Sequence, residues 1–202
     1  MTSAVRHVVL DLGGVVCRFD PAARRAALEE LTGMESEAID EAIWGSGLDA
    51  AAERGEIDPS TMRVLVAGAL GGRIDVTAIR TAWSYAFVPD ETVLALVDRL
   101  TVPAVVFTNN GPLLSDCLDH ELLRVRGRFS QVLCSWELGA TKPDLEAFRA
   151  VTARLEADPA DVLFVDDSDD NVTAAREVGW RAERFTGADA LGALFAGRDL
   201  LE

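Results

Sequence analysis

Long apolar runs and a signal-peptide pattern are both missing from this sequence of 202 residues. No apolar run approaches the roughly 20 residues that a membrane-spanning helix needs. The N-terminal segment does not show the pattern of a signal peptide. The sequence therefore predicts a cytoplasmic protein without a membrane partner.

Cysteine and positive charge are also scarce. The three cysteines, Cys17, Cys117 and Cys134, are scattered, and no two of them are at metal-ligand spacing, so no zinc site is expected. We expect them to be small buried apolar residues in a reducing compartment. The 19 basic residues face 34 acidic ones, a formal net charge of −15. This charge argues against nucleic acid as a partner, and an anionic ligand would need a local cation.

Lysine and asparagine are rarer still. Lys142 is the only lysine, and asparagine occurs only at Asn109, Asn110 and Asn171. A lone lysine among arginines indicates a role that a compact ammonium fills and a planar guanidinium does not. Taken alone, chance explains this observation equally well.

What is abundant is an alternation of short apolar runs with helical stretches. Hydrophobic residues make up 49% of the chain and charged residues 26%, as in a folded protein. The alternation predicts an α/β fold with a parallel sheet. We expect strands over 7–11, 104–108, 131–135 and 162–166, and helices over 90–100, 112–123, 144–155 and 168–178.

One interval, residues 18–87, interrupts this alternation with helical periodicity broken by glycines and Pro59. No convincing strand is predicted inside it. We therefore expect a core formed by residues 1–17 and 88–202, with 18–87 inserted as a helical cap. The cap is either a lid over the active site or a structural elaboration.

Polar residues follow the predicted strands. Asp11 ends the first, Thr108-Asn109-Asn110 the second and Asp166-Asp167 the fourth, while Lys142 follows the third. Ligands of doubly wound sheets bind beyond the carboxyl ends of the strands, so we expect these four segments to converge on one site.

The four segments DLGGVV, VVFTNN, ATKPD and LFVDDSDDN resemble the ordered motifs of the haloacid dehalogenase-like hydrolase superfamily. The resemblance covers the whole chain, including a cap between the first and second motifs. The sequence is most similar to phosphatases with a short helical cap and a D-L-G first motif, a group that includes sugar-phosphate phosphatases. The resemblance implies a Rossmann-like core and hydrolysis of small phosphate monoesters, which makes a small phosphorylated metabolite the expected partner.

The site residues suit this chemistry. Asp11 is the predicted nucleophile, because a carboxylate that attacks phosphorus forms an acyl phosphate that water then hydrolyses. Lys142 would keep that carboxylate ionised and offset developing charge. The Thr108 hydroxyl and the backbone amides of Asn109 and Gly13 would bind phosphate oxygens.

The predicted cofactor is Mg²⁺, which prefers oxygen ligands. Its predicted protein ligands are the carboxylates of Asp11 and Asp167 and the carbonyl of Gly13. The resemblance favours Asp167 over Asp166 as the direct ligand. Asp166 and Asn171 are then expected to support the metal ligands without binding the metal directly.

The sequence departs from the family at Gly13, where most of its phosphatases carry a second aspartate that acts as general acid and base. Poor leaving groups such as alkoxides should therefore be slow, while aryl, acyl and anomeric sugar phosphates should be preferred. Candidate substrate contacts in the cap are Trp44, Arg54, Trp83 and Tyr85.

Two other functions are compatible with the sequence. One is a catalytically weak regulatory protein that binds a phosphorylated metabolite, which Gly13 favours and the set Asp11, Lys142 and Asp167 opposes. The other is a 2-haloacid dehalogenase, whose attack on carbon needs no metal and leaves the Asp166-Asp167 pair without a purpose. Sensitivity to a chelator and turnover of an aryl phosphate distinguish these functions.

Overall fold

The computed structural model describes residues 4–72 and 74–202, and its centre is a parallel sheet of five strands. The strand order is β5-β4-β1-β6-β7. The strands are β1 (His7–Leu10), β4 (Ala104–Thr108), β5 (Gln131–Cys134), β6 (Val162–Asp166) and β7 (Arg181–Arg184). The predicted Rossmann-like α/β core is confirmed, and β7 is an addition to it. Its sequence RAER contains no apolar run, because it is an edge strand.

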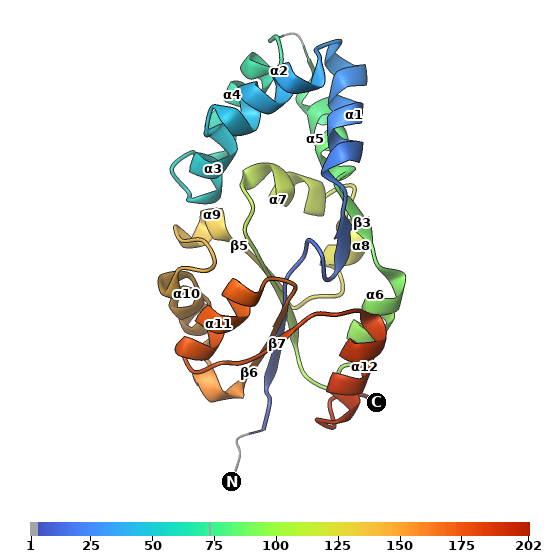
Figure 1. Cartoon of the computed structure of the whole chain (residues 1–202), viewed down its shortest axis with the longest axis vertical. Helices are drawn as coiled ribbons and strands as arrows, with labels where there is room; N and C mark the ends of the chain where they lie inside the picture. Colours follow the sequence, from blue (N-terminus) through green and yellow to red (C-terminus); the bar gives the residue numbers. More distant parts are fainter. Residues whose placement is uncertain (1–3, 73) are drawn as a thin grey trace.

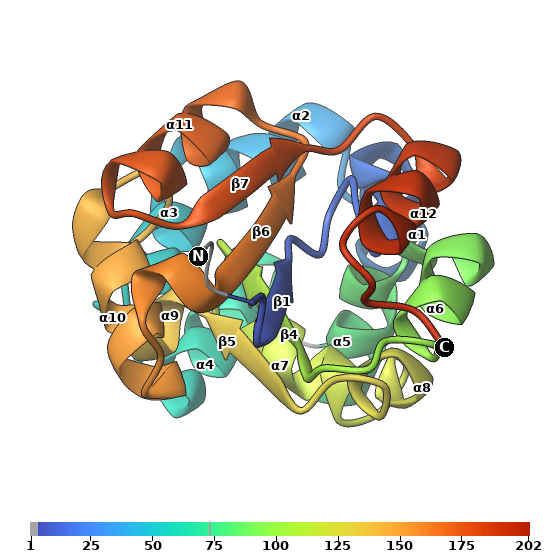
Figure 2. The same cartoon turned by 90° about the horizontal axis from the view of Figure 1, so that it is seen from below.

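Helices cover both faces of the sheet, which explains why the central strands are apolar throughout. Alternate residues of β1 point to opposite faces: Val9 belongs to one buried cluster, and Val8 and Leu10 to the other. Figure 2 shows α10 (Leu145–Leu155) and α11 (Asp169–Glu177) on one side, and α6 (Glu91–Val97) and α12 (Ala188–Ala196) on the other.

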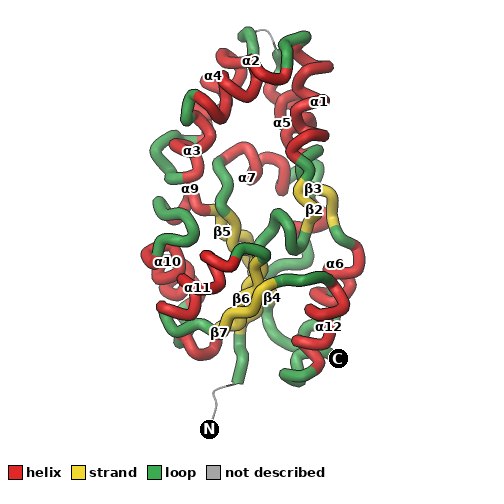
Figure 3. Tube along the Cα trace, viewed as in Figure 1, coloured by secondary structure: helices red, strands yellow, loops and turns green. Residues whose placement is uncertain are grey.

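The cap is joined to the core through a two-stranded antiparallel ribbon, formed by β2 (Cys17–Phe19) and β3 (Phe87–Pro89). Figure 3 shows these two strands at the junction between the halves of the molecule. The expectation of no strand within 18–87 is therefore wrong at both ends of that interval. Strands of three residues are too short to produce a recognisable alternation of apolar and polar side chains.

The cap itself is helical. It contains α1 (Pro21–Thr32), α2 (Ser36–Asp40), a π-helical turn (Glu41–Gly45), α3 (Leu48–Glu53), α4 (Pro59–Ala69) and α5 (Val76–Ser84). Asp20 caps α1 by accepting a hydrogen bond from the backbone of Ala23, and Pro21 occupies its first turn. Within the described residues, no helix has the length and apolarity needed to cross a membrane.

The remaining core helices are α7 (Pro112–Leu118), α8 (Leu123–Arg126), α9 (Ser135–Leu138) and a 3₁₀ turn (Pro159–Asp161). The helix predicted over 112–123 is thus two helices. The backbone amides of His120 and Leu122 both donate to the Cys117 carbonyl, which closes a turn after Leu118.

The cap lies over the carboxyl ends of the strands, with α3 beside α9 (Figure 1). Contact there is close at Gly55, where an added Cβ would lie 2.4 Å from the Trp136 carbonyl oxygen. Two ion pairs also join cap to core: Arg63 Nε donates to Asp116 at 2.8 Å, and Arg80 Nε to Glu121 at 3.0 Å. The cap therefore covers the carboxyl ends of the strands.

Candidate active site

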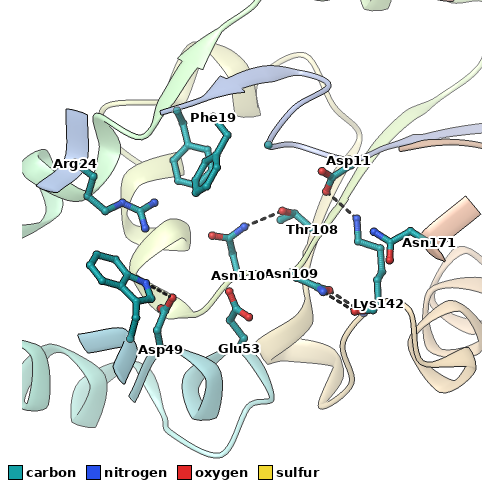
Figure 4. Close-up of a pocket in the computed structure, with 13 residues that line it drawn as sticks. Asp11, Phe19, Arg24, Asp49, Glu53, Thr108, Asn109, Asn110, Lys142 and Asn171 are labelled. Carbon is teal, nitrogen blue, oxygen red and sulfur yellow. Dashed lines mark hydrogen bonds and ion pairs between the residues drawn. The ribbon is translucent and has the colours of Figure 1, made fainter. Parts of the chain in front are cut away.

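A cavity of about 270 Å³ lies between the strand ends and the cap. Figure 4 shows polar side chains from both halves around it. The core contributes Asp11, Gly13, Thr108, Asn109, Asn110, Lys142 and Asn171, and the cap and its ribbon contribute Phe19, Arg24, Trp44, Asp49, Glu53 and Phe87. The four predicted segments therefore meet at one place.

Lys142 is at the centre of the core half. Its buried Nζ donates to Asp11 Oδ1 at 2.7 Å, to Asp166 Oδ2 at 2.7 Å and to the Phe107 carbonyl at 2.9 Å. Asn109 clamps the Lys142 backbone through hydrogen bonds to its amide and its carbonyl. Burial alone would lower the pKa of Lys142, but Asp11 and Asp166 raise it above its usual value. The ammonium is therefore charged and held in one position.

Asp11 is 8% exposed and opens onto the cavity. Burial raises the pKa of its carboxyl to about 6, although Lys142 opposes this rise, and Asp166 adds to it. The opposing effect of Lys142 shows why a buried carboxyl that is to be ionised needs a cation beside it. Further positive charge near Asp11 would favour its ionised form.

Asp166 is fully buried, and both of its carboxylate oxygens are occupied. Oδ1 accepts from the Ser168 amide at 2.8 Å, and Oδ2 accepts from Lys142. Asn171 Nδ2 lies 3.1 and 3.0 Å from the two oxygens. These contacts hold the Asp166 carboxylate in one position, and the supporting role of Asp166 and Asn171 stays a prediction.

Asp11, Asp166 and Asp167 offer carboxylate oxygens that lie within 4.8 Å of one another. Three carboxylates against one ammonium leave an excess of negative charge. Burial and the neighbouring Asp166 raise the pKa of the exposed Asp167 carboxyl. A hard divalent cation suits this oxygen donor set and would relieve the repulsion. The residues present therefore fit Mg²⁺.

Gly14 shapes the same cluster. Its φ is +94°, and a Cβ added there would lie 2.3 Å from Asp167 Oδ2. The absence of a side chain at position 14 is thus what lets Asp167 approach the loop after Asp11. Gly13 is different: it has an ordinary φ, and the nearest atoms to a Cβ there would be those of the Phe19 side chain, at 3.6 Å.

Thr108 is buried at the end of β4 and lines the cavity. Its hydroxyl accepts a hydrogen bond from Asn110 Nδ2 at 2.8 Å, so its own hydrogen is available to an acceptor in the cavity. Asn110 received no role from the sequence beyond its position in the motif. The Ser135 hydroxyl accepts a hydrogen bond from the Asn110 amide and fixes the loop.

The cap half of the cavity contains a buried arginine that the sequence analysis missed. Arg24 is 4% exposed, and its Nε donates to the Trp83 carbonyl at 3.1 Å. Its guanidinium carbon lies 4.3 Å from the Trp83 ring centroid, while Nη2 has no hydrogen-bond partner. Burial lowers the pKa of Arg24 to about 10, so it is charged at neutral pH. The available signal was its position four residues before the buried Leu28, on the apolar face of α1.

Two cap carboxyls, Asp49 and Glu53, complete the lining, and neither was predicted. Trp44 Nε1 donates to Asp49 at 2.9 Å. Of the four cap candidates named from the sequence, only Trp44 lines the cavity. Trp83 is buried beneath Arg24, Tyr85 is 53% exposed, and Arg54 pairs with Glu56 on the surface.

The sequence profile of the haloacid dehalogenase-like hydrolases matches residues 5–179. The chain belongs to this family. The match spans all four motifs and the whole cap, so the predicted family and the prediction of a hydrolytic enzyme are confirmed.

Curated relatives are distant. "Phosphatase MT3486" of Mycobacterium tuberculosis is 28% identical over 188 residues, which cover 89% of this chain and 86% of the relative. The D-ribitol-5-phosphate phosphatase of Bacteroides thetaiotaomicron is 22% identical, with 92% and 94% covered. The drimenol cyclase drtB of Aspergillus calidoustus is 27% identical, and this chain spans about a third of its length (34%).

Among solved structures, a HAD-family enzyme of B. thetaiotaomicron in complex with magnesium and inorganic phosphate superimposes with a TM-score of 0.76. It is 23% identical, and the superposition covers 95% of this chain and 100% of that one. At this identity the likeness establishes the shared fold, cap included.

Proposed function

We propose that this family member is a cytoplasmic, Mg²⁺-dependent phosphatase of small phosphate monoesters that forms an aspartyl-phosphate on Asp11. The observation that carries the proposal is the contact between Lys142 and Asp11 beside the carboxylate cluster, at the core end of the cavity. The phosphatases among its relatives agree with this chemistry.

The core residues each have a task in that reaction. An oxygen of Asp11 attacks phosphorus, and the bond to the leaving oxygen breaks. Lys142 stabilises the charge that develops between Asp11 and the phosphoryl group, and it needs no reorganisation because three acceptors already fix it. The Thr108 hydroxyl donates a hydrogen bond to a phosphoryl oxygen, and so do the backbone amides of Gly13 and Asn109.

We assign the metal ligands to Asp11, Asp167 and the Gly13 carbonyl. Asp166 is not assigned as a ligand, because Lys142 and Asn171 already hydrogen-bond its carboxylate. Bound there, Mg²⁺ would neutralise the phosphoryl oxygens and orient them for in-line attack. Asp167 is the exposed member of the cluster and has the freest carboxylate. It is therefore the residue whose loss should weaken the metal most.

The cap side of the cavity indicates a polar leaving group. Arg24 has an unpartnered donor, while Asp49 and Glu53 offer acceptors. A hydroxyl both accepts and donates, so a small polyhydroxylated molecule such as a sugar phosphate satisfies both kinds of group. The D-ribitol-5-phosphate phosphatase among the relatives acts on a substrate of this chemistry.

The test is hydrolysis of p-nitrophenyl phosphate and of a panel of sugar and polyol phosphates, with Mg²⁺ and with a chelator. We expect turnover that the chelator abolishes and that Asp11→Asn lowers to background, with the circular dichroism of the fold retained. An amide of the same size cannot form the acyl phosphate. Near wild-type turnover in Asp11→Asn would refute the proposal.

The alternatives from the sequence make different predictions in the same assay. A metabolite-binding regulator would bind phosphorylated compounds and leave every one of them intact. A 2-haloacid dehalogenase would release halide in the presence of the chelator. Gly13 still favours the regulator, but the carboxylate cluster suits a divalent cation, which the phosphatase needs and the dehalogenase does not.

A further inference from the structure

We propose that Glu53, on α3 of the cap, is the general acid that protonates the leaving oxygen and then the base that activates water. This inference rests on the proposed phosphatase function and adds a catalytic residue to it. It replaces the expectation of slow alkyl phosphates, which considered only residues close to Asp11 in the sequence.

The other carboxyls at the site have other tasks. Asp11 is ion-paired with Lys142, and Asp166 is fully buried with both oxygens hydrogen-bonded. Asp49 accepts a hydrogen bond from Trp44. Within the described part of the chain, Glu53 is the carboxyl lining the cavity for which no hydrogen bond or ion pair is found. It is thus free to contact a substrate.

Glu53 is also positioned by close packing between cap and core. A Cβ added to Gly111 would lie 3.1 Å from Ala52 Cβ and 3.7 Å from the Glu53 amide nitrogen. The end of α3 therefore rests directly on the loop that follows Thr108 and carries Asn110. A second contact, between Gly55 and the Trp136 carbonyl, fixes the residues just after α3.

The direction of the side chain suits an in-line reaction. In Figure 4 the Glu53 carboxyl points into the cavity toward Asn110, across the cavity from Asp11. The leaving oxygen departs on the side of phosphorus opposite the attacking carboxylate. With the phosphoryl group held at Asp11 and Thr108, that oxygen faces the cap wall where Glu53 lies.

The environment keeps Glu53 protonated near neutral pH. Burial raises the pKa of its carboxyl to about 7, and Asp49 adds to the rise, while Arg24 and Arg54 oppose it. An acid with a pKa near the working pH can both give up a proton and take one back, which is what the two half-reactions require.

The steps balance. In the first, an Asp11 oxygen bonds to phosphorus, the phosphorus–oxygen bond to the leaving group breaks, and the Glu53 proton moves to the leaving oxygen, which departs as an alcohol. In the second, water attacks the phosphorus of the aspartyl-phosphate and gives a proton to the Glu53 carboxylate, and the bond between phosphorus and the Asp11 oxygen breaks. Phosphate leaves, and both carboxyl groups return to their starting states.

The experiment compares the wild type with Glu53→Gln on phosphate esters whose leaving groups rise in basicity: p-nitrophenyl, phenyl and a simple alkyl phosphate. Asp49→Asn is the matched control, an acid-to-amide change one turn earlier on α3. We expect Glu53→Gln to lose about 10²–10⁴-fold in kcat/KM on the alkyl ester and only a few-fold on the p-nitrophenyl ester. Asp49→Asn should change all three by a similar factor.

A second readout is the pH profile on the alkyl ester. The wild-type kcat/KM should fall as pH rises through about 7, where Glu53 loses its proton, and Glu53→Gln should lack that descending limb. Equal losses on all three esters, or none, would overturn the proposal. Turnover of p-nitrophenyl phosphate by Glu53→Gln shows that the variant folds. Asp11→Asn separates the two proposals. Retained activity in Asp11→Asn would refute the phosphatase mechanism, whereas equal effects of Glu53→Gln on all three esters would refute only the role of Glu53 as general acid.

Discussion

Among single residues, Lys142 is a buried cation that three acceptors hold in place. Its side chain is 2% exposed and its Nζ is shared by two carboxylates and a carbonyl. A guanidinium is larger and planar, so it cannot occupy one point among three acceptors. The chain's single lysine therefore stands where an arginine would not fit.

We predict that Lys142→Arg loses activity even though the charge is kept. Lys142→Met should in addition lower the free energy of unfolding by about 3–5 kcal/mol, because it leaves Asp11 and Asp166 buried without a cation. Denaturant titration and p-nitrophenyl phosphate turnover measure the two effects. Arg149→Met, which breaks an exposed pair on α10, is the control. Full activity in Lys142→Arg would show that this position does not require a lysine, and chance would then explain why the chain has a single one.

The neighbouring glycines at 13 and 14 allow a matched prediction. Gly14→Ala should weaken Mg²⁺ binding strongly, because its Cβ would displace the Asp167 carboxylate and φ is +94°. Gly13→Ala, with 3.6 Å to the Phe19 ring, should leave the thermal stability of the metal-free protein nearly unchanged. A Mg²⁺ titration of activity and thermal melts with a chelator distinguish them. Equal Mg²⁺ requirements in Gly14→Ala and the wild type would contradict this geometry.

The core side of the site could be predicted from the sequence, and the cap side could not. Asp11 directly follows β1 and Thr108 ends β4, while Lys142 comes after β5 and the short α9, so the sheet topology brings the three to the same edge. Arg24 and Glu53 reach the cavity only through the packing of α1 and α3 over the core. No local pattern in the sequence encodes that packing. Of the aromatic cap residues named from the sequence, Trp44 lines the cavity, and Trp83 and Tyr85 do not.

Among the elements, the strands could be located because buried parallel strands are apolar on both faces. Four predicted strands agree with the structure to within one residue at each end. The edge strand β7 and the ribbon of β2 and β3 were missed, since each is short and partly exposed. The ribbon connects cap and core by only two chain crossings, so cap docking depends on side-chain contacts.

One of these contacts provides an element-scale prediction. Glu121 accepts hydrogen bonds from Arg80 Nε at 3.0 Å and from Thr81 Oγ1 at 2.9 Å, and it joins α5 of the cap to the core. Arg80→Ala should cost about 1 kcal/mol, or roughly 2–4 °C in Tm, because the pair is partly buried. It should also raise KM several-fold by loosening the cap.

Arg54→Ala is the control for cap docking. Its exposed guanidinium pairs with Glu56 inside the cap, so we expect at most a slight drop in Tm and no change in KM. An Arg80→Ala variant that matched Arg54→Ala in both quantities would show that this ion pair does not hold the cap.

For the whole molecule, the formal charge of −15 makes the placement of cations decisive. Among the described residues, the buried basic side chains are Lys142 and Arg24, and both line the cavity. The local cation that the sequence analysis required for an anionic ligand is thus present. The cap also buries acidic groups there, and these should make the stability of the fold depend on pH.

The pH dependence follows from Glu53, whose pKa rises from 4.5 to about 7 on folding because of burial. A carboxyl with a raised pKa holds its proton more tightly in the folded state, so its contribution to stability is complete below pH 4.5. That contribution is lost as pH rises toward about 7. Glu53→Gln stays neutral at every pH and escapes the loss. We therefore predict that its Tm, measured with a chelator, matches the wild type near pH 4.5 and exceeds it at pH 8.

The control for this measurement is Glu56→Gln, three residues further along. A hydrogen bond from Arg54 lowers the pKa of the exposed Glu56, so that carboxylate stabilises the fold above its unfolded pKa and loses this effect as pH falls. Glu56→Gln should therefore shift Tm slightly downward at pH 8, the opposite sign to Glu53→Gln. A Tm difference between Glu53→Gln and the wild type that stayed constant from pH 4.5 to pH 8 would show that folding does not raise the pKa of Glu53. The cap would then hold an ionised carboxylate against the cavity, and its burial would have to be balanced by Arg24.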